Sequence, residues 1–126
     1  MKAIIVADDS AIIRNIIEKS LKDEYVILKA NNGKEAVKHL VENKYDIIGM
    51  FLDLTMPEYD GFVVLDHFKK NKVFRICPVV IISGDDTKKT IDRAFTYDIV
   101  DMLNKPFSSN NIKIMVDKMI TFKNSI

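Results

Sequence analysis

The chain has 126 residues, of which 48% are hydrophobic, and this combination predicts one compact domain with a buried core. Its formal net charge of +1 gives no general attraction to nucleic acid or to an anionic membrane. The first apolar run is too short for a signal peptide or a membrane span, and the single cysteine, Cys77, excludes an intrachain disulfide. We therefore expect a soluble cytoplasmic protein whose function depends on local sites.

Apolar runs of strand length alternate with helical patterns from the start of the chain. Ala3–Ala7 and Tyr25–Ala30 predict strands, the second at an edge of a sheet. Helical spacing predicts a helix from near Ser10 and another over Lys34–Asn43. The first of these helices is expected to pack through Ile13, Ile16, Ile17, Ser20 and Leu21, and the second through Ala36, Val37, Leu40 and Val41.

The middle of the chain predicts two buried strands separated by a helix. Ile47–Leu52 is an apolar run interrupted only by Gly49 and is too short for a typical helix. Pro57 prevents a helix from starting directly after it, which leaves Asp53 on a loop at the carboxyl end of this strand. Pro78–Ile82 predicts the next buried strand. The intervening helix begins after Gly61 and is expected to bury Phe62, Leu65 and Phe68.

The last third of the chain continues the same alternation. A short helix is predicted after the capping residues Asp85, Asp86 and Thr87, with Ile91, Ala94 and Phe95 as its apolar positions. A weaker strand follows over Ile99–Leu103. The last helix runs from about Ser109 and is expected to bury Ile112, Val116, Met119 and Ile120. Strands and helices that alternate with short connections predict a doubly wound α/β fold with a parallel sheet.

Polar residues follow several of the predicted strands at their carboxyl ends. Asp8 and Asp9 follow the first strand, Asp53 the third, Ser83 the fourth and Lys105 the fifth. In an open parallel sheet these ends meet at one edge, where ligands bind. Clustered carboxylates repel one another unless a cation joins them, and hard oxygen ligands suit Mg²⁺. A lysine and a hydroxyl facing them complete a clamp for a phosphoryl group.

Each of these residues also has an ordinary structural explanation. Asp8-Asp9-Ser10 is a typical start of a helix, Asp53 a typical turn residue and Ser83-Gly84 a typical turn, while Lys105 is a type of residue common on surfaces. The carboxyl edge of the sheet would lack a functional site only if every one of these residues had its ordinary structural role. The combination therefore favours a site.

The whole chain resembles the receiver domain of two-component response regulators. The resemblance rests on the acidic pair after the first strand, on Asp53 in the segment DLTMPEYDG, on Ser83 and on Lys105-Pro106-Phe107. It implies a single receiver domain over residues 1–126 and a flavodoxin-like (βα)5 fold with the strand order 2-1-3-4-5. It also agrees with a cis peptide bond between Lys105 and Pro106, which we expect because the chain must turn sharply after the lysine.

The resemblance further implies how the site residues act. Asp53 accepts a phosphoryl group from the phosphohistidine of a sensor histidine kinase or phosphotransfer protein, and the acyl phosphate is then hydrolysed. Mg²⁺ is held by Asp8, Asp9, Asp53 and the main-chain carbonyl of Thr55. Lys105 pairs with the phosphoryl oxygens, and Ser83 moves to hydrogen-bond one of them. Such a domain catalyses only its own phosphorylation and dephosphorylation.

The expected output surface comprises the helix after Thr87, the strand 99–103 and the helix from Ser109. It is expected to contact a downstream protein or a covalently linked output domain, or to form a homodimer. Met102 stands where the family commonly has an aromatic switch residue. The lysines and the arginine around this surface favour an acidic partner or a second copy over nucleic acid or membrane, although they are also compatible with solvated helix faces: Lys88, Lys89, Arg93, Lys113, Lys118 and Lys123.

Three other functions are compatible with parts of this pattern. A haloacid dehalogenase-like hydrolase normally has a second aspartate where this chain has Thr55. In a flavodoxin-like electron carrier, Asp8 and Asp9 would repel the flavin phosphate. A phosphorylation-independent binding module does not need the complete set of acids and lysine. A stand-alone regulator and a receiver belonging to a longer protein both remain open.

Overall fold

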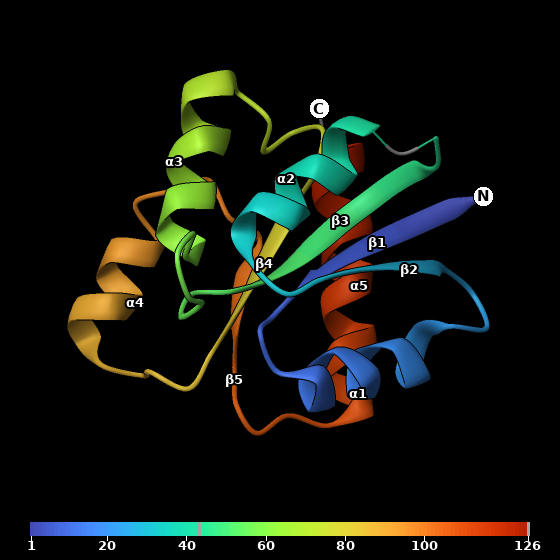
Figure 1. Ribbon diagram of the computed structural model, residues 1–126, viewed down its shortest axis with the longest axis horizontal. Helices are drawn as coiled ribbons and strands as arrows, with labels where there is room; N and C mark the ends of the chain where they lie inside the picture. Colours follow the sequence, from blue (N-terminus) through green and yellow to red (C-terminus); the bar gives the residue numbers. More distant parts are fainter. Residues whose placement is uncertain (43, 126) are drawn as a thin grey trace.

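The computed structural model describes residues 1–42 and 44–125. The five strands form one parallel sheet in the order β2-β1-β3-β4-β5, which confirms the predicted fold and strand order. Helices and strands alternate in the order β1 (Lys2–Ala7), α1 (Ala11–Leu21), β2 (Val26–Ala30), α2 (Gly33–Glu42), β3 (Asp46–Asp53), α3 (Gly61–Asn71), β4 (Val79–Ser83), α4 (Lys88–Ala94), β5 (Asp101–Asn104) and α5 (Ser109–Asn124) (Figure 1).

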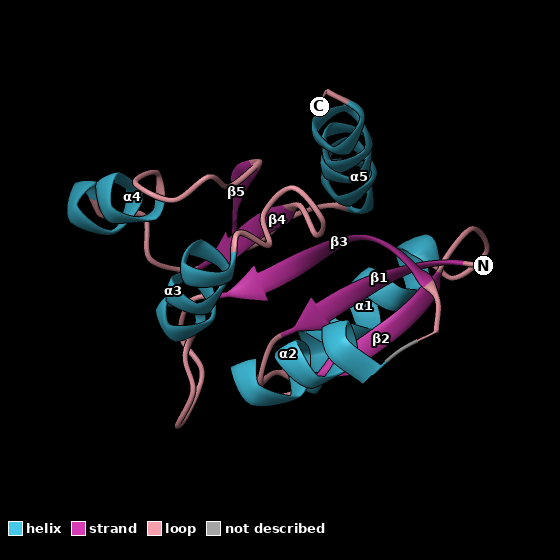
Figure 2. Ribbon diagram, turned by 90° about the horizontal axis from the view of Figure 1, so that it is seen from above, coloured by secondary structure: helices cyan, strands magenta, loops and turns pink. Residues whose placement is uncertain are grey.

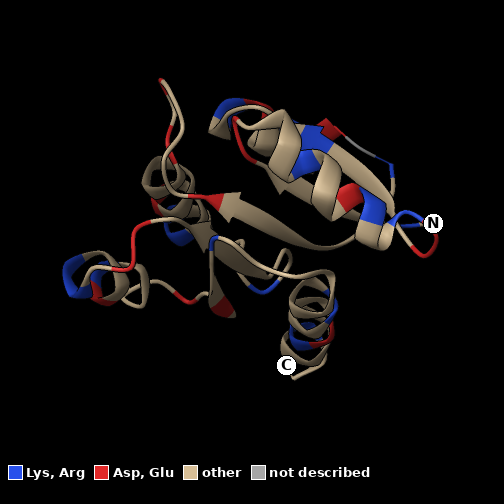
Figure 3. Ribbon diagram, turned by 90° about the horizontal axis from the view of Figure 1, so that it is seen from below, with Lys and Arg blue, Asp and Glu red and all other residues tan. Residues whose placement is uncertain are grey.

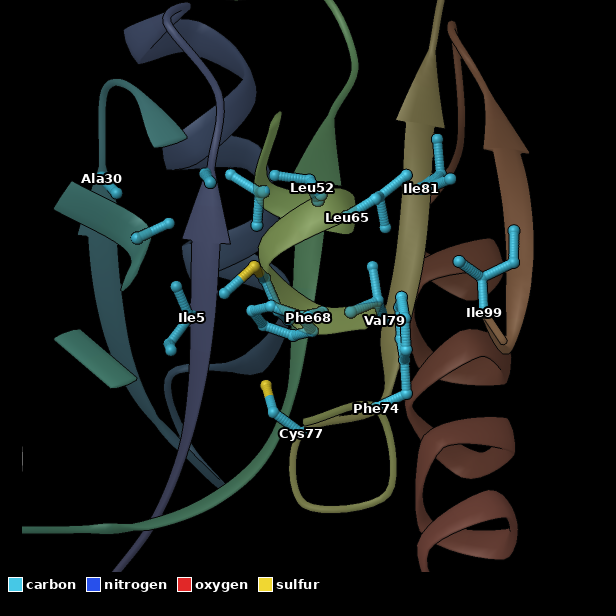
Figure 4. Packing of buried hydrophobic residues seen from close by; sticks show 14 of the residues in the cluster. Ile5, Ala30, Leu52, Leu65, Phe68, Phe74, Cys77, Val79, Ile81 and Ile99 are labelled. Atoms are coloured by element: carbon cyan, nitrogen blue, oxygen red, sulfur yellow. The ribbon is translucent and has the colours of Figure 1, made fainter. Parts of the chain in front are cut away.

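Helices cover both faces of the sheet, as Figure 2 shows from above. On one face, α2 and α3 pack on the strands, and Phe68 and Leu65 of α3 lie over β1, β3 and β4 (Figure 4). On the other face, α1 and α5 contribute Ile17 and Met119 to a second core cluster. Because side chains alternate along a strand, Ile5 of β1 enters the first cluster and its neighbours enter the second. The central strands are therefore buried on both faces, as their largely apolar sequence predicts.

Side chains of small polar residues cap several of the helices. Ser10, Asp60, Thr87 and Ser108 each precede a helix and accept a hydrogen bond from the main-chain N–H three residues later. Such caps satisfy N–H groups that the helix itself leaves without partners. The predicted cap of the short helix α4 is therefore confirmed at Thr87.

Strand β3 contains a bulge that the sequence pattern does not predict. Ala3 pairs with Ile47 but Ile4 pairs with Gly49, so Ile48 is an extra residue in β3. Gly49 then lies against α5: a Cβ added there would lie 2.6 Å from the sulfur of Met119. The glycine thus allows the last helix to approach the sheet closely.

Element boundaries differ from the prediction at several positions. Asp53 is the last residue of β3 rather than a loop residue, and β5 begins at Asp101 rather than at Ile99. Ile99 is buried but precedes the strand. Helix α2 begins at Gly33, and Asn43, predicted at its end, lies outside the described residues.

Some predicted core positions are exposed. The exposed fractions are 41% for Ile16, 74% for Val41 and 52% for Phe95, and Phe95 follows the last residue of α4 instead of lying within the helix. Cys77 is buried as expected, and burial raises the pKa of its thiol to about 12. None of the described helices combines the length and hydropathy needed to cross a membrane.

Candidate functional site

Three carboxylates meet at the carboxyl edge of the sheet. Asp8 follows β1, Asp53 ends β3, and one oxygen from each of Asp8, Asp9 and Asp53 lies within 4.8 Å of the others. Asp8 is fully buried and Asp53 is 3% exposed, whereas Asp9 is exposed. The convergence expected from the order of the strands is therefore present, with one acid open to solvent.

Lys105 reaches into this cluster from the end of β5. Its Nζ lies 2.9 Å from Oδ2 of Asp8 and 3.4 Å from Oδ2 of Asp53. The Lys105 N–H donates to the carbonyl oxygen of Ser83 at 2.9 Å, and the bond to Pro106 is cis, as predicted. Lys105 is therefore a part of the acidic site and not an ordinary surface charge.

The surroundings of Asp53 favour its neutral form. Burial and the nearby charge of Asp8 raise the pKa of Asp53 to about 6, although Lys105 and the Thr55 N–H act in the opposite direction. Burial lowers the pKa of Lys105, but the carboxylates of Asp8 and Asp53 outweigh this effect and raise it overall. The lysine stays charged at neutral pH, whereas Asp53 titrates near the physiological range.

The loop after β1 is fixed by several hydrogen bonds around Asp8. The Asp8 N–H donates to the carbonyl oxygen of Ala30, and Oδ1 of Asp8 accepts from the Ser10 N–H at 2.8 Å. Arg14 donates to the Asp8 carbonyl oxygen at 2.6 Å. The apolar spacing that predicts this helix does not indicate the contact, because it concerns only the apolar positions. The signal of this contact is the position of Arg14 one helical turn after the Ser10 cap.

The helix-cap explanation of this acidic segment applies to Ser10 alone. The Ser10 hydroxyl accepts from the Ile13 N–H at the start of α1. Asp8 instead turns toward Lys105, and in the described part of the chain no hydrogen bond to the Asp9 side chain is present. The acidic pair is therefore free of a capping role.

Ser83 ends β4 beside a small cleft. Its side chain is buried, and its hydroxyl donates to the Asp85 carbonyl oxygen at 3.2 Å and accepts from the Asp85 N–H at 3.0 Å. The adjoining cleft has a volume of about 240 Å³ and is lined by Thr55, Met56, Ser83 and Asp85, among others. Ser83 thus forms a turn, as the structural alternative predicted, and also faces the space next to the end of β3. The contacts of Asp85 with Ser83 add to the capping role that its sequence position predicts.

The acidic cluster has the donor set of a site for a hard divalent cation. Oδ2 of Asp8 is buried, and among the described residues it forms an ion pair with the Nζ of Lys105 at 2.9 Å but accepts no well-oriented hydrogen bond. A buried oxygen of this kind, next to carboxylates of Asp9 and Asp53, can bind a cation through oxygen ligands alone. The residues present therefore fit a metal such as Mg²⁺.

Comparisons with known proteins agree with this fold and site. The sequence model of the response regulator receiver domain matches residues 4–117. An NtrX-like response regulator of Rickettsia conorii is 33% identical over 91% of this chain and 24% of its own length. The transcriptional regulatory protein ResD of Bacillus subtilis is 31% identical over 93% of the chain and 47% of its length. A protein-glutamate methylesterase/protein-glutamine glutaminase of Caldanaerobacter subterraneus is 35% identical over 94% of the chain and 33% of its length.

Solved structures show the same similarity. A Francisella response regulator receiver domain has a TM-score of 0.82 and 28% identity, with 99% of this chain and 98% of that chain covered. NtrX from Brucella abortus has a TM-score of 0.83 and 26% identity, with 98% of this chain and 28% of that chain covered. The chain spans between about a quarter and a half of the length of the curated relatives named above.

The fold and the site define a flavodoxin-like α/β protein with an acid–lysine cluster at the carboxyl edge of its sheet. The extent of the family match makes the classification specific. The chain belongs to the family of response regulator receiver domains, the signalling domains of two-component systems. The resemblance recognised in the sequence is thereby confirmed.

Proposed function

We propose that residues 1–126 form a single receiver unit that accepts a phosphoryl group on Asp53 in the cytoplasm. The observation that carries this proposal is the position of the Asp53 carboxylate, which is 3% exposed and lies 3.4 Å from the Nζ of Lys105. Among the clustered acids, Asp53 alone ends the central strand. The donor is the phosphohistidine of a sensor histidine kinase or a phosphotransfer protein.

The transfer proceeds by attack of an Asp53 oxygen on phosphorus. The phosphorus–nitrogen bond to the imidazole breaks, and the nitrogen keeps the electron pair. Lys105, which contacts Asp53 Oδ2, pairs with the negative phosphoryl oxygens. Water later attacks the same phosphorus, which releases inorganic phosphate and restores the carboxylate. The domain acts only on its own aspartate.

The residues that hold Mg²⁺ in this proposal are Asp8, Asp9, Asp53 and the main-chain carbonyl of Thr55. The ion supplies positive charge that offsets the repulsion between the carboxylates and the incoming phosphoryl group. Asp8 and Asp53 contribute from the buried side of the cluster and Asp9 from the solvent side. The Thr55 N–H already binds Oδ1 of Asp53 at 3.3 Å, which fixes the orientation of this carboxylate.

Ser83 is proposed to hydrogen-bond the phosphoryl group and to change the surface formed by α4, β5 and α5. The output is a downstream protein, a covalently linked output domain or a second copy of the receiver that binds this surface. The main-chain bond from Lys105 to Ser83 joins the ends of β4 and β5, so a change at one reaches the other.

Acetyl phosphate and Mg²⁺ provide a direct test. Intact-protein mass spectrometry is expected to show the addition of one phosphate to the wild-type chain and none to Asp53→Asn. Asp86→Asn is the matched control, because Asp86 is an exposed acid in the loop before α4 and outside the acidic cluster. Undiminished labelling of Asp53→Asn would refute the assignment.

A further inference from the structure

The hydrogen of the Ser83 hydroxyl already has an acceptor. Ser83 Oγ donates to the carbonyl oxygen of Asp85 at 3.2 Å and accepts from the Asp85 N–H at 3.0 Å. A serine hydroxyl carries a single hydrogen, so it cannot donate to Asp85 and to a second oxygen at full strength. A hydrogen bond from Ser83 to a phosphoryl oxygen on Asp53 therefore requires Ser83 to leave the Asp85 carbonyl.

The side chain of the same residue organises the start of α4. Oδ1 of Asp85 accepts from the Thr87 N–H at 2.9 Å, and Oδ2 accepts from the Thr90 hydroxyl at 2.8 Å. Thr87 is the N-cap of α4, and its hydroxyl accepts from the Thr90 N–H. These hydrogen bonds favour the ionised carboxylate and lower the pKa of Asp85. One residue thus contacts Ser83 through its main chain and the first turn of α4 through its side chain.

Helix α4 has few other interactions that hold it in place. It spans Lys88–Ala94, and Ala94 is its one buried residue. Near its C-terminal end, the guanidinium of Arg93 stacks over the ring of Phe62 of α3, with 3.7 Å between Cζ and the ring centroid. Loss of the Asp85 contacts should therefore loosen the N-terminal turn more than the C-terminal end.

We propose that Asp85 is a positioning residue that couples Ser83 to helix α4. In the resting protein the Asp85 turn holds the Ser83 hydroxyl and the first turn of α4 together. When Ser83 transfers its hydrogen bond to the phosphoryl group, the turn and the helix start are released. This inference rests on the proposed function, because it requires phosphorylation of Asp53 and a response of Ser83.

Binding of beryllofluoride with Mg²⁺, a phosphoryl mimic, provides the test, with the affinity measured by titration calorimetry. Asp85→Ala removes contacts that hold the resting turn, so it should bind the mimic roughly three- to tenfold more tightly than wild type, the equivalent of one lost cap. Asp85→Asn retains a side-chain acceptor for Thr87 but loses the negative charge. The affinity of Asp85→Asn for the mimic should therefore lie within about twofold of wild type. This comparison distinguishes loss of the hydrogen bonds from loss of the negative charge. Asp86→Ala controls for loss of an acid nearby.

The Ser83→Ala background distinguishes coupling from a merely structural role. In that background, Asp85→Ala should leave the affinity unchanged, because no serine has to leave the turn. In wild type, amide exchange in the first turn of α4 should become faster when the mimic binds, and in Ser83→Ala it should not. Equal gains in both backgrounds, or the same gain in Asp85→Asn as in Asp85→Ala, would overturn the proposal.

Different results would contradict the phosphoacceptor function of Asp53 and the positioning role of Asp85. Absence of beryllofluoride binding to the wild-type protein contradicts the proposed phosphoacceptor function itself. Normal binding with unchanged exchange in α4 leaves that function intact and contradicts the role of Asp85.

Discussion

Asp53 lies in surroundings that disfavour its negative charge, and the positive charge of Lys105 offsets this effect only in part. Burial and the charge of Asp8 raise its pKa to about 6, while Lys105 opposes the shift. The unfolded chain has an ordinary aspartate pKa near 3.8, so the folded state binds more protons between that value and about 6. The stability of the metal-free protein therefore decreases as the pH rises through this window. Above about pH 6 the full free-energy cost of the buried Asp53 charge is present.

Asp53→Asn is accordingly expected to stabilise the metal-free fold. At pH 7.5 the free energy of unfolding should rise by about 2 kcal/mol, because the substitution removes a buried charge and leaves Lys105 paired with Asp8. The gain should disappear as the pH falls toward 4, where Asp53 of the wild type is protonated. Urea denaturation in the presence of a chelator measures both values. A gain that is the same at the two pH values would show that charge is not its origin.

Substitution of Asp9 should change metal binding without lowering the stability of the fold. Asp9 is exposed, and the Ser10 side chain caps α1 instead. Asp9→Ala should weaken Mg²⁺ binding at least about tenfold. Without metal, its melting temperature should equal or exceed that of wild type, because one of three neighbouring negative charges is lost. Ser10→Ala is the contrasting variant and should lose about 1 kcal/mol of stability. A similar loss in Asp9→Ala would contradict this view.

The residues of the site were predictable because of where they stand in the chain. Asp8, Asp53 and Lys105 each follow or end an apolar strand, and parallel strands bring such positions to one edge. The different burial of Asp8 and Asp9 was not predictable. It depends on the main-chain bond from Asp8 to Ala30 and on the ion pair with Lys105, which only the folded sheet creates.

At the level of elements, strands β1 and β3 are predictable from apolar runs, the second interrupted only by Gly49, whereas irregular features are not. A bulge such as that at Ile48 has no characteristic sequence, because it arises from pairing with another strand. The short strand β5 has mixed polarity: Asp101 contributes its side chain to an ion pair with Lys118 of α5 at 2.7 Å. The pattern of apolar residues alone therefore predicts the start of this strand two residues too early, at Ile99.

Gly49 tests how closely α5 must approach the sheet. A Cβ at this position would lie 2.6 Å from the sulfur of Met119 and 2.7 Å from the main-chain oxygen of Pro78. The flexible side chain of Met119 can move aside, but a shift of the Pro78 main chain would disturb the neighbouring strand. Gly49→Ala is therefore expected to destabilise the protein by about 1–3 kcal/mol in chemical denaturation. Gly84→Ala is the matched control and should change stability little, because no described residue other than its chain neighbours has an atom within 4 Å of its added Cβ. Equal stability of the two variants would contradict the close-packing argument.

At the scale of the whole molecule, the charges of the α4–β5–α5 surface are more balanced than the sequence indicated. Lys88 pairs with Asp92 at 2.8 Å and Lys118 with Asp101 at 2.7 Å. Lys123 contacts Asp46 at the amino end of β3. Basic and acidic segments accordingly lie close together on these helices in Figure 3. The surface therefore has a weaker preference for an acidic partner than a continuous basic rim would have.

The same surface exposes apolar side chains. Ile114 of α5 is 44% exposed, and a groove of about 530 Å³ runs beside it, with Val100 and Phe122 also in its lining. An apolar centre bordered by paired charges is typical of surfaces that bind proteins. This arrangement supports a protein partner or a second receiver as the output proposed above.

Met102 should report how this surface responds to phosphorylation. Its side chain is half-buried on β5 and packs against the cluster beneath α2 and α3. Because methionine is flexible and unbranched, it cannot hold one switched state as firmly as an aromatic ring. We expect two conformations that differ by little free energy, with phosphorylation shifting a mixture already present. NMR relaxation dispersion of the Met102 methyl group should therefore show exchange in the resting protein, and beryllofluoride should move its resonance toward the minor state. Met1, which is 85% exposed, provides a methyl control that should not respond. A single unexchanging Met102 resonance, unchanged by the mimic, would exclude this surface as the output.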